Sequence, residues 1–129
     1  MATATYSDVL TLAAWNAAMT GMGNVKLVWG SYTGTGVSGP ENPNILTFDG
    51  APLLLRIRPM WDFDKEYTLN MQRGYNTAKL PVSTSTSPVD LSCSWFDNYV
   101  SWHTTGGNNA TFQLNLQGKT YWYFALVGV

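Results

Sequence analysis

The stretch that decides the fold is Lys119-Thr120-Tyr121-Trp122-Tyr123-Phe124-Ala125-Leu126-Val127-Gly128-Val129. With the two-residue period of a strand, one face carries Tyr121, Tyr123, Ala125, Val127 and Val129, and the other carries Trp122, Phe124, Leu126 and Gly128. A strand that is apolar on both faces is normally covered on both, by a second sheet, a helix or another subunit. Four aromatic residues in succession followed by Val-Gly-Val favour a strand over a helix. We therefore expect this stretch to be the central strand.

The composition indicates a single domain with an unusual surface. At 129 residues the chain is long enough to hold one core, and 45% of its residues are hydrophobic. Charged residues make up only 12% of the chain, roughly half the usual share, whereas aromatic residues reach 14%. A surface so poor in charge must be covered by Ser, Thr, Asn, Gly and tyrosine hydroxyls, or partly buried in an oligomer.

Charge and cysteine usage disfavour several classes of function. The net charge of −1 provides no electrostatic footprint for nucleic acid, and only Arg56 and Arg58 stand close together on one strand face. The single Cys93 cannot form an intrachain disulfide, and its apolar neighbours predict a buried thiol. No segment has the roughly 18 consecutive apolar residues of a membrane span, so we expect no membrane insertion. The N-terminus lacks a basic region and contains Asp8, which does not fit a signal peptide.

One helix is expected, at the N-terminus. Residues 5–19 are rich in alanine, and Thr5 with Asp8 resembles a capping box. The sequence therefore predicts a helix and connector over residues 1–23, followed by a β-domain over residues 24–129. The helix is too short to be stable alone, so it packs on its own domain or associates with a neighbouring chain.

The rest of the chain has the pattern of short strands separated by turns. The expected strands are Val25–Tyr32, Asn44–Phe48, Pro52–Pro59, Glu66–Arg73, Asp90–Phe96, Tyr99–His103, Thr111–Leu116 and the terminal strand. Residues 33–43 are expected to be a long loop, and residues 76–88 a loop or a weak edge strand. In Thr111–Leu116 the alternation places Phe112, Leu114 and Leu116 inward. Regular spacing of this kind is typical of an antiparallel sandwich or barrel, and we predict an all-β fold, an antiparallel β-sandwich of about 8–9 strands.

Two groups of segments follow a pattern found in a known family. The first is Gly30-Ser31-Tyr32-Thr33-Gly34-Thr35-Gly36, then Asn42-Pro43-Asn44-Ile45-Leu46-Thr47-Phe48, then Pro52-Leu53-Leu54-Leu55. The second is Ser94-Trp95-Phe96-Asp97-Asn98-Tyr99-Val100-Ser101-Trp102, then Gln113-Leu114-Asn115, then Gly118-Lys119-Thr120-Tyr121-Trp122-Tyr123-Phe124-Ala125. Together they resemble the module at the C-terminal ends of phage tail fibre proteins. The sequence departs from that module at Leu53, where the module usually has lysine, and residues 60–88 have no match.

The resemblance implies a non-enzymatic head domain of a phage or prophage tail fibre, or a small fibre-associated protein, at the host-facing end. It implies a homotrimer that adheres to a host cell-surface glycan or protein and contacts other tail proteins. The protein would then be part of the virion, made in the bacterial cytoplasm without a signal peptide. No cofactor is implied.

The candidates for catalysis are weak. His103 is the one histidine, and Ser101 and Asp97 lie close to it in sequence. On a strand these three side chains lie in a row on one face, which cannot converge as a catalytic triad. We therefore predict no catalytic residue and no enzymatic activity.

Three carboxylates, Asp62, Asp64 and Glu66, stand at alternate positions and form a weak calcium candidate. The same residues could serve a depolymerase through a pair of carboxylates about 5–9 Å apart. A solvated strand face or turn accounts for them better, because the glycine turn and the regular ligand set of an EF-hand are missing. No cluster of cysteine and histidine exists for zinc.

Six tryptophans suggest carbohydrate binding, because flat aromatic rings stack on sugar faces. Trp29, Trp102 and Trp122 lie in strands with an apolar pattern, and we expect them in the core. The candidates for exposed ligand-binding anchors are Trp61, Tyr75 and Tyr99.

Alternative functions to the fibre head are a structural decoration of the collar or baseplate and a free-standing carbohydrate-binding module. The module would be monomeric and would expose a row of aromatic residues on one face.

Overall fold

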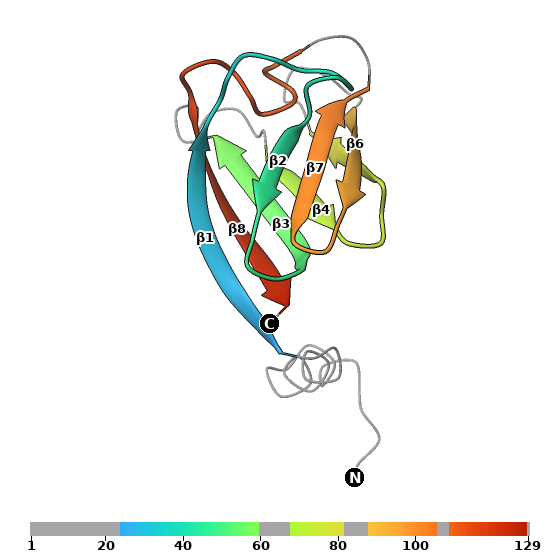
Figure 1. Ribbon diagram of the computed structural model, residues 1–129. Coiled ribbons are helices and arrows are strands. Elements are labelled where there is room, and N and C mark those ends of the chain that lie inside the picture. Colours follow the sequence, from blue (N-terminus) through green and yellow to red (C-terminus); the bar gives the residue numbers. More distant parts are fainter. Residues whose placement is uncertain (1–23, 60–67, 82–87, 106–108, 129) are drawn as a thin grey trace, which may run out of the picture.

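The computed structural model describes residues 24–59, 68–81, 88–105 and 109–128, and over these ranges the chain is all-β (Figure 1). The strands are β1 (Val25–Thr33), β2 (Asn44–Thr47), β3 (Pro52–Pro59), β4 (Leu69–Gln72), β5 (Thr77–Leu80), β6 (Val89–Trp95), β7 (Tyr99–Thr104) and β8 (Thr120–Gly128). They form two four-stranded antiparallel sheets, in the orders β1-β8-β3-β4 and β2-β7-β6-β5. The expected N-terminal helix over residues 5–19 lies outside the described residues.

The C-terminal strand β8 is central in the first sheet, as predicted. It pairs with β1 along its whole length, from Thr120 opposite Thr33 to Gly128 opposite Val25. On its other side it pairs with β3, from Tyr121 opposite Pro59 to Val127 opposite Pro52. Strand β8 is therefore hydrogen-bonded on both edges, which satisfies its backbone polar groups and leaves its two faces to be covered by side-chain packing.

The second sheet is built on the hairpin of β6 and β7, which correspond to the predicted strands Asp90–Phe96 and Tyr99–His103. Trp95 lies opposite Val100, and the ladder continues to Leu91 opposite Thr104. The two remaining strands, β2 and β5, lie at the edges. The weak edge strand expected within residues 76–88 is therefore confirmed as β5, which pairs with β6 alone.

A single core lies between the two sheets and takes side chains from both. Its buried members are Phe48, Leu55, Ile57, Leu69, Met71, Ala78, Leu80, Leu91, Cys93, Val100, Trp102, Leu114, Tyr121, Ala125 and Val127. The buried thiol predicted at Cys93 is confirmed, and burial raises the pKa of this thiol to about 11. At neutral pH the side chain is therefore a thiol with almost no thiolate, and it acts as a small apolar group.

The strand predicted over Thr111–Leu116 is wrong, because these residues form turns. The Asn109 side chain accepts hydrogen bonds from the backbone N–H groups of Thr111 and Phe112, which bends the chain at its start. Leu114 adopts a left-handed backbone conformation with φ of 59°. As a result Gln113 and Asn115, which an alternating strand would turn outward, are buried beside Leu114.

The segments 33–43 and 109–119 meet at one end of the sandwich (Figure 1). The backbone N–H of Gly34 donates to the carbonyl oxygen of Lys119 at 2.8 Å, and that of Gly36 donates to Asn115 at 2.7 Å. A side chain at position 34 would press on the backbone of the second segment. Its Cβ would lie against the carbonyl oxygen of Leu116 and 2.6 Å from the carbonyl carbon of Asn115.

We therefore expect Gly34→Ala to lower the free energy of unfolding by about 2 kcal/mol through overpacking against backbone atoms. The matched control is Gly128→Ala, where the new Cβ would lie 3.6 Å from the nearest described atom, the carbonyl oxygen of Ala51, and the change should stay within about 0.5 kcal/mol. Urea unfolding of both variants measures the difference. Equal stability of the two variants would contradict the close packing of the two segments.

Candidate functional site

Two tryptophans lie on the surface. Trp102 is fully buried as predicted, but 70% of Trp29 and 50% of Trp122 are exposed, so the prediction that they lie in the core is wrong. Trp29 and Trp122 project from the outer face of the first sheet, whose inner face carries Tyr121 and Val127. The two-residue period places residues on faces but does not say which face another layer covers.

We call the outer surface of Trp29, Arg56, Arg58, Trp122 and Phe124 the aromatic face. The strand register orders it in two rows: Trp29 pairs with Phe124 and Phe124 with Arg56, while Trp122 pairs with Arg58 in the next row. The rings of Trp29 and Phe124 meet edge to face with centroids 6.4 Å apart. The guanidinium of Arg56 stands 6.0 Å from the centroid of the Phe124 ring. These residues and Tyr123 line a shallow cavity of about 250 Å³.

The aromatic face is positively charged. Both Arg56 and Arg58 are exposed, and neither forms an ion pair with a carboxylate of the described residues. Their outward neighbours on β4 are the neutral side chains of Asn70 and Gln72. The face therefore combines large flat rings with two guanidinium groups whose charges are not neutralised within the described part of the chain.

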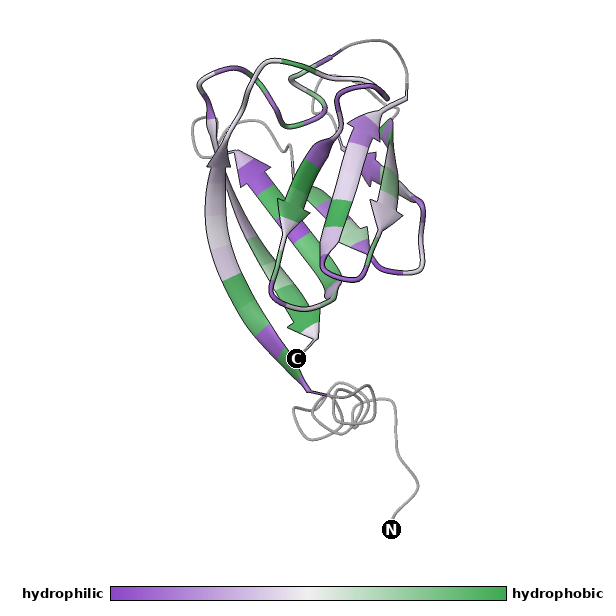
Figure 2. Ribbon diagram, in the orientation of Figure 1, coloured by the Kyte–Doolittle hydropathy of each residue, from purple (hydrophilic) through white to green (hydrophobic). Residues whose placement is uncertain are grey.

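The outer face of the second sheet is different. Most of its positions on β5, β6 and β7 are polar, namely Thr77, Lys79, Asp90, Ser92, Ser94, Ser101 and His103, and Tyr99 is the aromatic residue on this face at the start of β7. Ile45 on the edge strand β2 is the large exposed aliphatic side chain on this side. In Figure 2 the lower part of β8 is green, the lower part of β1 is green with one purple band, and the upper parts of both strands are pale. The two exposed tryptophans thus lie on the first sheet.

The predicted anchors Tyr75 and Tyr99 lie at the same end of the molecule. Tyr75 is 63% exposed in the turn between β4 and β5, and its carbonyl oxygen accepts a hydrogen bond from the Trp95 indole N–H at 3.0 Å. Tyr99 is half-buried and stacks on Phe96 with ring centroids 4.2 Å apart. Trp61, the third predicted anchor, lies outside the described residues.

This second aromatic group, Tyr75, Trp95, Phe96 and Tyr99, offers less to a ligand than the aromatic face. Arg73 lies beside it and donates hydrogen bonds to the carbonyl oxygens of Pro52 and Phe96. The same guanidinium stands 5.6 Å from the centroid of the Trp95 ring. Two of its donors therefore hold the turn together, and its charge lies against the Trp95 ring.

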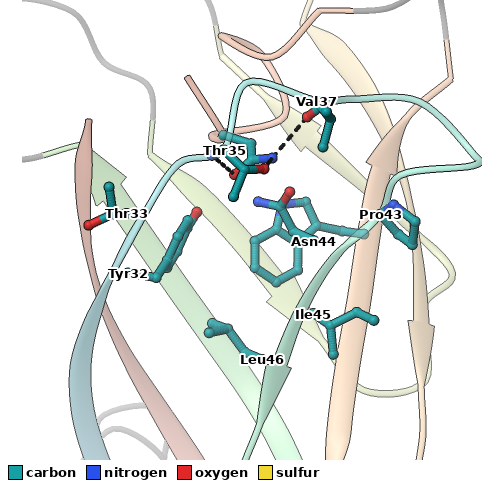
Figure 3. A pocket seen from close by; sticks show the side chains of 10 residues that line it. Tyr32, Thr33, Thr35, Val37, Pro43, Asn44, Ile45 and Leu46 are labelled. Carbon is teal, nitrogen blue, oxygen red and sulfur yellow. Dashed lines mark hydrogen bonds between the residues drawn. The ribbon is translucent and has the colours of Figure 1, made fainter. Parts of the chain in front are cut away.

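A second hollow, of about 230 Å³, opens between β1 and β2 below the loop of residues 33–43 (Figure 3). Its lining includes Tyr32, Thr35, Asn44 and Asn115. The Asn115 amide donates to the Thr35 hydroxyl and to the Val37 carbonyl oxygen, both at 2.9 Å. The Tyr32 hydroxyl donates to the carbonyl oxygen of Leu114 at 2.7 Å, and burial raises the pKa of Tyr32 well above its usual value.

Gln113 organises the polar groups behind this hollow. Its side-chain oxygen accepts from the backbone N–H groups of Gly39 at 2.9 Å and Thr104 at 3.0 Å. Its side-chain nitrogen donates to the carbonyl oxygen of Asn42 at 2.8 Å and to the side-chain oxygen of Asn44 at 3.1 Å. Among the described residues no buried side-chain nitrogen or oxygen lacks a partner. The buried polar groups of this hollow are therefore already hydrogen-bonded within the protein and stabilise the fold.

The other residues considered for catalysis or metal binding lie as follows. His103 and Ser101 lie in a row on β7, consistent with the argument against a triad, and Asp97 is exposed in the β6–β7 turn. Asp62, Asp64 and Glu66 lie outside the described residues. In the part of the chain that the structure describes, no group of three or more His, Cys, Asp or Glu side chains could hold a metal ion. No helix within those ranges is long and apolar enough to cross a membrane.

Comparison with known proteins adds no relative: no protein family, curated protein or solved structure matches this chain. The resemblance to tail fibre heads therefore remains a prediction based on the two groups of sequence segments.

The buried amide of Gln113 provides a test of the structure at this end. We expect Gln113→Ala to lower the free energy of unfolding by about 3 kcal/mol, because it removes the buried side-chain oxygen that accepts from the N–H groups of Gly39 and Thr104. The exposed Gln117 is the matched control, and Gln117→Ala should change stability by less than about 0.5 kcal/mol. Denaturant unfolding followed by circular dichroism compares them, and a Gln113→Ala variant as stable as the control would rule out this network.

Proposed function

We propose that this chain is a non-enzymatic adhesion module, the head of a phage or prophage tail fibre or a small protein associated with the fibre. The observation that carries the proposal is the exposure of Trp29 and Trp122 on one face of the first sheet. On this proposal the protein acts in the virion and is made in the bacterial cytoplasm. Its partner is a host cell-surface glycan, held on the aromatic face.

The geometry of the aromatic face suits the binding of a sugar chain. Trp29 and Trp122 stand on strands that pair along their whole length, so a rigid backbone fixes their positions before a ligand arrives. The apolar faces of sugar rings stack on flat indole rings, and a preformed platform loses little conformational entropy on binding. Contacts of this kind are individually weak. They fit adhesion, in which many copies act together.

Multivalency would supply the affinity that a single face lacks. In a homotrimer three aromatic faces contact one cell surface, and each further contact becomes intramolecular once the first has formed. We propose that residues 5–19 form a helix and that the domain over residues 24–129 assembles with two further copies, through surfaces other than the aromatic face. The trimer would also contact other tail proteins.

The free-standing carbohydrate-binding module is favoured by the same exposed rings and differs from the fibre head in being monomeric. A decoration of the collar or baseplate would have no use for a glycan platform. Ligand binding therefore separates the decoration from the other two, and solution mass separates the module from the fibre head.

Binding should depend on the two tryptophans. We expect the protein to bind a subset of bacterial surface polysaccharides on a glycan array, and Trp29→Ala and Trp122→Ala each to weaken that binding about tenfold. The matched control is Ile45→Ala, which removes a side chain that is 55% exposed on the other sheet and should leave binding unchanged. Because Trp29 and Trp122 are exposed, their variants should unfold at the wild-type temperature. Binding that survives the loss of both tryptophans would overturn the assignment of the aromatic face.

The oligomeric state follows from the solution mass. Light scattering after size exclusion should give about three times 14.2 kDa for the full chain. A chain starting at Asn24 should remain trimeric if the β-domain carries the contacts. A trimer that needs residues 1–23 would assign assembly to the N-terminal segment, and a monomer in both cases would favour the free-standing module.

A further inference from the structure

We infer that the aromatic face selects an anionic saccharide, a sugar chain that carries carboxylate or phosphate groups. The inference rests on the proposed adhesion function and adds the chemical class of its ligand. The observation behind it is the position of Arg56 and Arg58, which lie in the same cross-strand rows as Phe124 and Trp122. A sugar stacked on the rings would have its acidic substituents beside the two guanidinium groups.

The two guanidinium groups have unused binding capacity. A guanidinium has five N–H donors in a planar fork, which matches the oxygens of a carboxylate or a phosphate. Arg56 and Arg58 are exposed and form no ion pair with the described residues, in contrast to Arg73, whose guanidinium donates to two backbone carbonyl groups. The spacing along β3 places both on the outer side of the sheet. An anion bound there would have a donor in each of two neighbouring rows.

A second copy of this chain is a poorer occupant of the same face. Pairing two aromatic faces would bring four guanidinium groups together, and the neighbouring outward residues Asn70 and Gln72 offer no negative charge. Burying like charges without partners is costly. A neutral sugar would stack on the rings but would form no ion pair with either guanidinium group. An anionic sugar would interact with both the rings and the guanidinium groups.

The test compares acidic sugars with neutral forms of the same chains. The probes are oligosaccharides of polygalacturonate and alginate, their carboxyl-reduced counterparts, and ribitol teichoic acid as the phosphate-bearing probe. Each is titrated against the full-length protein at two salt concentrations by isothermal calorimetry. We expect at least one acidic probe to bind about tenfold more tightly than a neutral form, the difference given by one charge-assisted hydrogen bond. Its affinity should fall as salt rises.

Substitutions of the arginines locate the effect. Arg56→Gln and Arg58→Gln should each remove most of the preference for the acidic probe and leave the weak binding of the reduced form unchanged. The matched control is Lys79→Gln, which removes the same charge from the exposed outer side of the second sheet. This control should keep the preference. Uronate and teichoic acid probes then distinguish a carboxylate-bearing from a phosphate-bearing glycan.

The possible failures are distinguishable. Equal binding of acidic and neutral forms, lost in Trp29→Ala, would overturn the anionic preference and leave the adhesion function standing. Acidic binding that Lys79→Gln weakens as much as Arg58→Gln would reveal unspecific attraction and overturn the inference. An absence of binding to every probe, together with no binding on the glycan array, would overturn both.

Discussion

The structure depends on one constraint: strand β8 is apolar on both faces, and among the described residues a second layer covers only one of them. The inner face, with Tyr121, Ala125 and Val127, is buried against the second sheet. Strands β1 and β3 hold β8 in place from either edge. The outer face, which carries the half-exposed ring of Trp122, is therefore left uncovered by the described residues. An exposed apolar row of this kind is expected to meet a ligand or partner.

At the end of the sandwich, hydrogen bonds of a side-chain amide take the place of strand pairing. Residues 34–43 and 109–119 lie outside the strands, so their backbone groups need other partners. Gln113 supplies them by joining Gly39, Asn42, Asn44 and Thr104 around one buried side chain. This network fixes the loop end to β2 and β7 of the second sheet. The polar residues that line the hollow in Figure 3 therefore form hydrogen bonds within the protein and stabilise this end of the fold.

Much of the sheet could be predicted from the sequence, because alternation and turn residues are local signals. The bounds of β3 agree with the predicted strand Pro52–Pro59, and the central place of β8 follows from its two apolar faces. The turns over 111–116 could not be predicted. Gln113 and Asn115 alternate with apolar residues as an exposed strand face would, and their burial depends on distant partners such as Gly39 and Thr35.

The candidate site was only partly predictable for a related reason. Proximity of Arg56 and Arg58 is visible in the sequence, since they stand two positions apart on one strand. Exposure of Trp29 and Trp122 is not, because periodicity assigns residues to a face without saying whether the fold covers that face. The sequence did contain one indication that this face is exposed. Once β3 is paired with β8, the two arginines lie on the same face as Trp122, and charged side chains favour an exposed face.

The most direct test of the central claim is the solvent accessibility of the tryptophan side chains in the intact protein. The measurement is the broadening of the six indole N–H signals in a ¹⁵N NMR spectrum by a soluble gadolinium chelate. We expect strong broadening for Trp29 and Trp122 in every oligomeric state, and none for Trp102. Trp29 and Trp122 signals as protected as that of Trp102 in the free protein would contradict it, because another part of the assembly would then cover the aromatic face.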